Sequence, residues 1–153
     1  TIMGAAKHKG TSVVECLVNC VIFNDGAHNW LAEKETRADR LIFLEHGKPM
    51  IFGKDRNKGL ILEGLSLNVA TIGENGITEK DILIHDSKCE DITLQYKLAM
   101  MEGPDFPIAV GVIRDVKTET YDEAMTKQID EVKSKSKIHN FDELVNSLEQ
   151  WEI

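Results

Sequence analysis

Two cysteines four residues apart, Cys16 and Cys20, are the side chains of this sequence whose type and spacing best suit chemistry. They lie in the segment VECLVNCVIFNDGAHNW (14–30), where an apolar run ends at an Asn-Asp-Gly turn. Cysteine thiolates bind zinc and iron–sulfur clusters. Along a β-strand the two residues would lie about 13 Å apart, whereas a metal–sulfur bond is about 2.3 Å long. Either Cys20 alone is a metal ligand, completed by residues elsewhere, or both cysteines are small apolar core residues.

A second candidate is the basic, glycine-rich segment HGKPMIFGKDRNKG (46–59). It places Lys48, Lys54, Arg56 and Lys58 among three glycines of an otherwise acidic chain. Free backbone N–H groups of such turns, together with lysines, bind phosphate or carboxylate groups. Two interpretations stay open, an anion- or nucleotide-binding module and a set of solvated turns.

The remaining reactive residues match no known catalytic signature. Cys89 stands in a polar loop, and no metal-ligand spacing occurs among the five histidines His8, His28, His46, His85 and His139. Walker A, G-x-G-x-x-G and G-x-S-x-G patterns are absent from the sequence. The sequence therefore assigns no catalytic residue.

Composition predicts one ordinary globular domain of 153 residues, with 42% hydrophobic and 29% charged residues. The net charge of −8 disfavours nucleic acid and anionic membranes as partners, because both are bound through Lys and Arg. Three irregularly spaced cysteines favour a reducing cytoplasm over a disulfide framework. An apolar run of about 18 residues, long enough to span a membrane, is also missing.

The elements that would position these residues alternate between helix and strand. Helical segments are predicted at 2–8, 29–38, 90–102 and from 117 onwards, with Asn140 as an N-cap and a capping pair at Thr78 and Asp81. Strands are predicted at 11–18, buried in a parallel sheet, at 60–72 and 108–116, and as a hairpin-like pair within 40–53. This alternation predicts an α/β fold with a β-rich middle and a helical C-terminal tail.

Five segments, taken in order, resemble the C-terminal half of the β subunit of 2-oxoacid:ferredoxin oxidoreductases. They are HKGTSVVECLVNCVIFNDGA, LEHGKPMIFGKDRNKGL, VATIGENGITEKDILIHD, GPDFPIAVGVIR and ELVNSLEQWEI. The resemblance implies the C-terminal part of a Rossmann-like, thiamine-diphosphate-binding domain. The chain would then be one incomplete domain: 1–30 ends the cofactor-binding core and carries the cluster cysteine, 31–116 forms a β-rich tail region, and 117–153 is a charged helical C-terminus.

The same resemblance implies a metal role for Cys20, as the last of four ligands to a [4Fe–4S] cluster whose other ligands lie upstream in the family. Cys16 would then be a packed residue of the strand. The family binds thiamine diphosphate and Mg²⁺ through a GDG motif that also lies upstream. The segment NDGAHN (24–29) echoes that motif but follows the cluster cysteine, and we interpret it as a turn.

The implied activity is oxidative decarboxylation of a 2-oxoacid, of the 2-oxoglutarate or pyruvate class, with coenzyme A. Its products are an acyl-CoA, CO₂ and electrons that pass through the cluster to ferredoxin. The partners would be an α subunit and ferredoxin in a hetero- or homo-oligomer, and the fragment alone would be inactive. The alternatives are a stand-alone anion- or nucleotide-binding module using 47–59, and a structural piece that packs against partner subunits. A strand at 11–18 without neighbours would also expose apolar surface and favour self-association.

Overall fold

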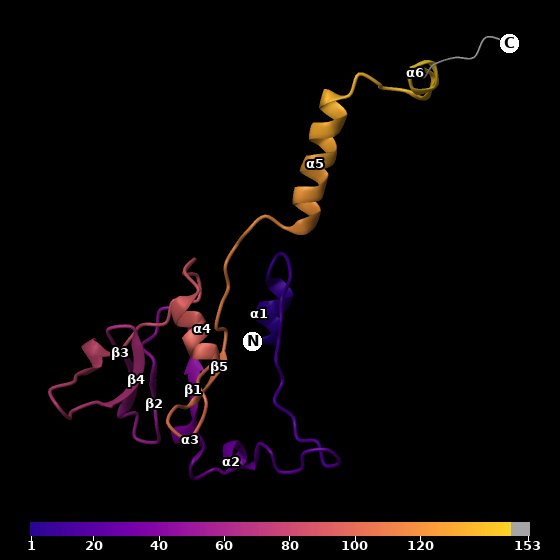
Figure 1. Ribbon diagram of the computed structural model, residues 1–153. Helices are drawn as coiled ribbons and strands as arrows, with labels where there is room; N and C mark the ends of the chain where they lie inside the picture. Colours follow the sequence, from indigo (N-terminus) through magenta and orange to yellow (C-terminus); the bar gives the residue numbers. More distant parts are fainter. Residues whose placement is uncertain (148–153) are drawn as a thin grey trace. The chain divides into compact units, whose positions relative to one another are not determined.

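The computed structural model describes residues 1–147 and divides the chain into two compact units (Figure 1). The first unit comprises Thr1–His8 and Ser12–Lys117, and the second comprises Lys9–Thr11 and Thr118–Ile153. Residues 148–153 lie outside the described part, together with the end of the segment ELVNSLEQWEI.

An antiparallel sheet in the order β2-β3-β4 forms one half of the first unit (Figure 1). Its strands are β2 (Ile51–Phe52), β3 (Lys58–Glu63) and β4 (Ser66–Thr71). Glu63 pairs with Ser66 across a two-residue turn that begins at Gly64, whose φ is +62°. Glycine at this position suits a type II′ hairpin turn. The strands predicted within 60–72 are therefore confirmed.

A parallel pair of strands, β1 (Leu41–Leu44) and β5 (Ile108–Gly111), forms the other sheet. The chain between them includes α4 (Thr93–Ala99), within the helix predicted at 90–102. The observed β5 covers the first half of the strand predicted at 108–116. With one parallel and one antiparallel sheet, the predicted α/β fold class is confirmed.

The core of the first unit draws on both sheets and on α4. Along β1 the burial alternates, so that Ile42 and Leu44 point inward while Phe43 is exposed. Gly59 allows a close approach, because a Cβ atom there would lie 2.5 Å from Cδ1 of Ile82. The buried cluster consists of Ile42, Leu44, Met50, Phe52, Leu60, Leu67, Leu98 and Met101.

The two short strands predicted within 40–53 are found as β1 and β2, but the hairpin-like connection predicted between them is wrong. β1 and β2 belong to different sheets, and the chain between them instead bonds to residues 83–85. Gly47 N–H donates to the His85 carbonyl over 2.8 Å, and Met50 N–H donates to the Leu83 carbonyl over 2.8 Å. These long-range bonds satisfy the backbone groups that a hairpin would have paired.

The strand predicted at 11–18 is also absent: residues 11–19 have no regular secondary structure. They follow α1 (Ile2–Lys7) and are exposed, with 91% of the Val13 side chain accessible. A β-strand requires a pairing partner, and neither sheet of the described residues offers one to this segment. The single helix predicted at 29–38 is likewise two short ones, α2 (Asn29–Ala32) and α3 (Arg37–Arg40).

Capping contacts are found in both units, at the two predicted positions and also at Thr120. In the first, Asp81 Oδ2 accepts from Thr78 N–H over 2.8 Å at the start of the 3₁₀ helix η1 (Glu79–Asp81). In the second, Thr120 begins α5 (Tyr121–Lys135), and its N–H donates to Glu123 Oε2 over 3.1 Å. Asn140 caps α6 (Phe141–Asn146), as predicted. Within residues 1–147, none of the helices is long and apolar enough to cross a membrane.

Candidate functional site

Cys20 opens a tight turn that follows the irregular segment 11–19. The N–H of Asn24 donates to the Cys20 carbonyl over 2.9 Å, and the two residues form an isolated antiparallel bridge. The Cys20 side chain is exposed to solvent, so iron could reach its sulfur. Its predicted ligand role therefore meets no steric obstacle on this chain.

The backbone of the same turn favours the thiolate form of Cys20. Hydrogen bonds from the N–H groups of Phe23 and then Ile22 lower the pKa of the Cys20 thiol, with a smaller contribution from Asn24. Hydrogen bonds to a charged form stabilise that form. The thiolate is the form of cysteine that binds metals, so this turn favours the form that the predicted ligand role requires.

Asn19 and Asp25 bracket the turn and were not singled out by the sequence. The Asn19 amide donates to Asp25 Oδ1 over 2.9 Å, and Gly26 N–H donates to Asn19 Oδ1 over 2.9 Å. Their residue types are a weak sign of such contacts, since Asn and Asp side chains commonly bond to nearby backbone in turns. The turn interpretation of NDGAHN is consistent with the structure, in which residues 21–28 form turns apart from the bridge residue Asn24.

The residues needed to complete a metal site around Cys20 are not gathered in the described part of the chain. There, no group of three or more His, Cys, Asp or Glu side chains could hold an ion. Cys16 and Cys89 are free and exposed, so the expectation that Cys16 is packed in a strand is wrong, because that strand does not form. The donor chemistry of the turn thus fits one corner of a four-thiolate cluster and not a complete site.

In the glycine-rich segment 47–59, an internal carboxylate already occupies the turn. Lys58 Nζ donates to Asp39 Oδ1 over 2.9 Å, and the N–H of Lys54 also bonds to the Asp39 carboxylate. Lys58 is the main reason that the pKa of Asp39 lies below its ordinary value. The backbone N–H and the lysine that could have held a foreign anion therefore hold a carboxylate of the same chain.

Three histidines connect distant segments of the first unit. His8 Nδ1 lies 2.8 Å from Asp115 Oδ1, and His46 Nδ1 lies 3.3 Å from Asp86 Oδ1, not beside the adjacent Glu45. His85 is buried, and its Nε2 lies 2.8 Å from the Val112 carbonyl oxygen. Each contact joins parts of the chain remote in sequence, and each suits a structural role.

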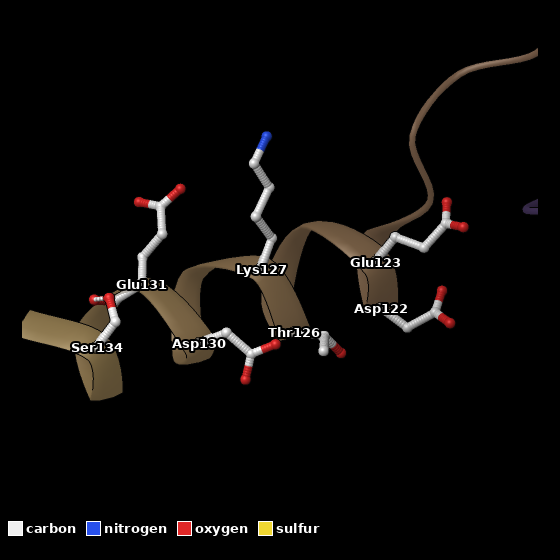
Figure 2. A pocket seen from close by; sticks show the side chains of 7 residues that line it. All are labelled: Asp122, Glu123, Thr126, Lys127, Asp130, Glu131 and Ser134. Carbon is white, nitrogen blue, oxygen red and sulfur yellow. Dashed lines mark hydrogen bonds between the residues drawn. The ribbon is translucent and has the colours of Figure 1, made fainter.

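A shallow surface along α5 is lined by side chains of one helix only. Figure 2 shows them fanning outward from the ribbon, with no second element opposite. A ligand needs walls on more than one side to be enclosed. This surface carries no candidate site, and its lining residues are Asp122, Glu123, Thr126, Lys127, Asp130, Glu131 and Ser134.

Comparison with known proteins gives one relevant similarity. The chain is 33% identical over 129 residues to the 2-oxoglutarate oxidoreductase subunit KorB of Mycobacterium tuberculosis. The aligned region covers 84% of this chain and 34% of that protein, so the chain spans about a third of the length of its relative. No protein-family model matches the chain, and no solved structure matches it either.

Proposed function

We propose, on the premise that this chain is related to part of a 2-oxoacid oxidoreductase β subunit, that it works as the C-terminal portion of such a subunit. The complete enzyme would be a 2-oxoacid:ferredoxin oxidoreductase of the cytoplasm, containing an α subunit. Its substrate would be 2-oxoglutarate, since the relative's name specifies that acid. The chain alone, spanning a third of that relative, would be inactive.

The proposed reaction joins a 2-oxoacid and coenzyme A into an acyl-CoA, with loss of CO₂, one proton and two electrons. The bond between the carboxylate and the keto carbon breaks, and the carbon–sulfur bond of the thioester forms. Thiamine diphosphate, held with Mg²⁺ by residues outside this chain, supplies the electron sink for decarboxylation when it is bound. The two electrons leave for ferredoxin, one at a time.

The contribution of this chain to electron transfer would be the Cys20 thiolate, as one of four ligands of a [4Fe–4S] cluster. Exposure of the side chain and its lowered thiol pKa support this role. The N–H groups of Phe23 and Ile22 would also tune the cluster, because hydrogen bonds to ligand sulfurs are among the factors that set its reduction potential.

The test is cluster reconstitution in the complete β subunit, with iron and sulfide measured per chain. We expect Cys20→Ala to lose the cluster, with its visible absorbance and the electron-paramagnetic signal of its reduced form. Cys16→Ala is the matched control, since it removes an exposed thiol four residues away and should retain both signals. Equal iron content in Cys20→Ala and the parent protein would disprove the assignment.

A structural role is a second candidate that one observation favours. Apolar side chains between Val13 and Phe23 are exposed, with Phe23 at 89% and Ile22 at 81%. Such a surface is typical of a segment that another part of an assembly covers. The anion-binding alternative has weaker support, because Asp39 already occupies the turn at 53–58.

A further inference from the structure

Helix α5 carries an apolar stripe that the described residues of the chain leave exposed. Tyr121, Met125, Ile129 and Val132 are 81%, 37%, 46% and 64% exposed. Their spacing of four, four and three residues places them on one face of the helix. The side chains of Figure 2 project from other faces of α5 and are polar. An isolated helix of this length is marginal in water, so a stripe of this kind calls for a partner.

The charges of α5 change sign along its length. Asp122 and Glu123 lie in the first turn, whereas Lys133 and Lys135 lie in the last. Glu123 already forms a salt bridge with Lys9, but within residues 1–147 neither Asp122 nor Lys133 forms one. At 100° per residue, Asp122 and Lys133 flank the same side of the apolar stripe.

We propose that α5 pairs with α5 of a second copy of this chain, the two helices running antiparallel about a two-fold axis at the level of Lys127. In this register, Met125 of one copy faces Ile129 of the other and Tyr121 faces Val132. Asp122 then lies beside Lys133 of the second copy, and the symmetry repeats each contact. The acidic first turn of one helix meets the basic last turn of the other.

Charge selects the antiparallel direction over the parallel one. In a parallel pair, Asp122 and Lys133 of one helix would lie on the opposite side of the seam from the same residues of the other helix, so neither would meet its counter-charge. Antiparallel packing also brings opposite ends of the two helix dipoles together. The pairing does not depend on Cys20 or on the proposed reaction, because it uses only side chains of α5.

The first experiment measures self-association of the full chain by sedimentation equilibrium over a range of concentrations. We expect Ile129→Asp to raise the dissociation constant at least about tenfold, because it places a charge in the centre of the stripe. Thr126→Asp is the matched control, since it adds the same charge to the polar face of the same helix and should leave the constant unchanged. Circular dichroism verifies equal helix content in both variants.

The second experiment fixes the direction of the pair. In a background in which Cys16, Cys20 and Cys89 are serines, Tyr121→Cys chains are mixed with Val132→Cys chains and treated with a short bis-maleimide. We expect the two variants to cross-link to each other, and Tyr121→Cys alone not to cross-link, because its two copies would lie about 20 Å apart along the helices. A chain that stays monomeric, association that Ile129→Asp leaves unchanged, or self-cross-linking of Tyr121→Cys would each overturn the proposal.

Discussion

At the scale of single residues, the chemistry of this chain is concentrated in one sulfur atom and the amides that face it. Exposure by itself would leave Cys20 an ordinary thiol, but the turn directs backbone N–H groups to its sulfur. A backbone N–H is fixed by the fold, so it favours the thiolate without a charged side chain nearby. The backbone of the turn therefore does more than any neighbouring side chain to lower the pKa of the Cys20 thiol.

This account predicts the pH dependence of Cys20 alkylation. In a variant with Cys16→Ser and Cys89→Ser, Phe23→Pro removes the N–H that contributes most to the lowered pKa. We expect the midpoint of the alkylation rate against pH to move to higher pH, measured with iodoacetamide and mass spectrometry. Phe23→Leu keeps the N–H and should leave the midpoint in place. Equal midpoints in the proline and leucine variants would contradict the role given to the amide.

Residue types alone could identify Cys20 as a candidate but could not show its environment. The sequence places Asn19 and Asp25 on either side of an Asn-Asp-Gly turn, yet many loops contain such residues. Their mutual hydrogen bond depends on the exact path of the chain between them. Similarly, the basic segment 47–59 suggests an anion site, and only the position of α3 and Asp39 reveals that the anion is internal.

At the scale of elements, Gly111 permits a close approach of the two backbones in the parallel pair of strands. Gly111 has a φ of +112°, and a Cβ atom there would lie 2.5 Å from the Leu44 carbonyl oxygen. Leu44 is its register partner in β1. No other residue type suits both the dihedral angle and the space.

We therefore expect Gly111→Ala to lower the free energy of unfolding by more than the roughly 1–3 kcal/mol that the backbone dihedral alone would cost. Gly47→Ala is the control, since Gly47 also has a positive φ, +75°, but nothing lies within 4 Å of the added Cβ. Urea titrations followed by circular dichroism compare the two variants. A loss of stability no larger in Gly111→Ala than in Gly47→Ala would show that the contact with Leu44 is unimportant.

The sequence correctly predicts those elements whose pairing strands or capping residues lie in the same stretch of chain. The strands within 60–72 and the helix in the stretch from 117 onwards are specified by local turns and caps. The strand predicted at 11–18 has the right composition but no pairing partner in the described residues. The hairpin within 40–53 was mistaken because pairing of β1 with β5 joins residues more than sixty positions apart, which no local pattern encodes.

At the scale of the whole molecule, the exposure of the apolar segment 13–23 requires an explanation, because no described residue covers it. Val13, Val18 and Phe23 are 91%, 73% and 89% exposed, and the proposed ligand Cys20 belongs to the same segment. An iron–sulfur cluster requires a shell that controls solvent access. The chain spans a third of its relative, so the remainder of a β subunit is the natural source of that shell.

Hydrogen exchange should report this difference between the chain and the complete subunit. In the chain alone, amides of 11–19 lack ladder hydrogen bonds and should exchange as fast as an unfolded peptide. In the complete β subunit we expect slow exchange, because an apolar segment rich in β-branched residues gains strand pairing when neighbours are present. The amides of β3 and β4 serve as the internal control, since both samples contain their ladder. Fast exchange at 11–19 in both samples, with β3 and β4 protected, would mean that the rest of the subunit does not cover this segment and that Cys20 lacks the enclosure its proposed role requires.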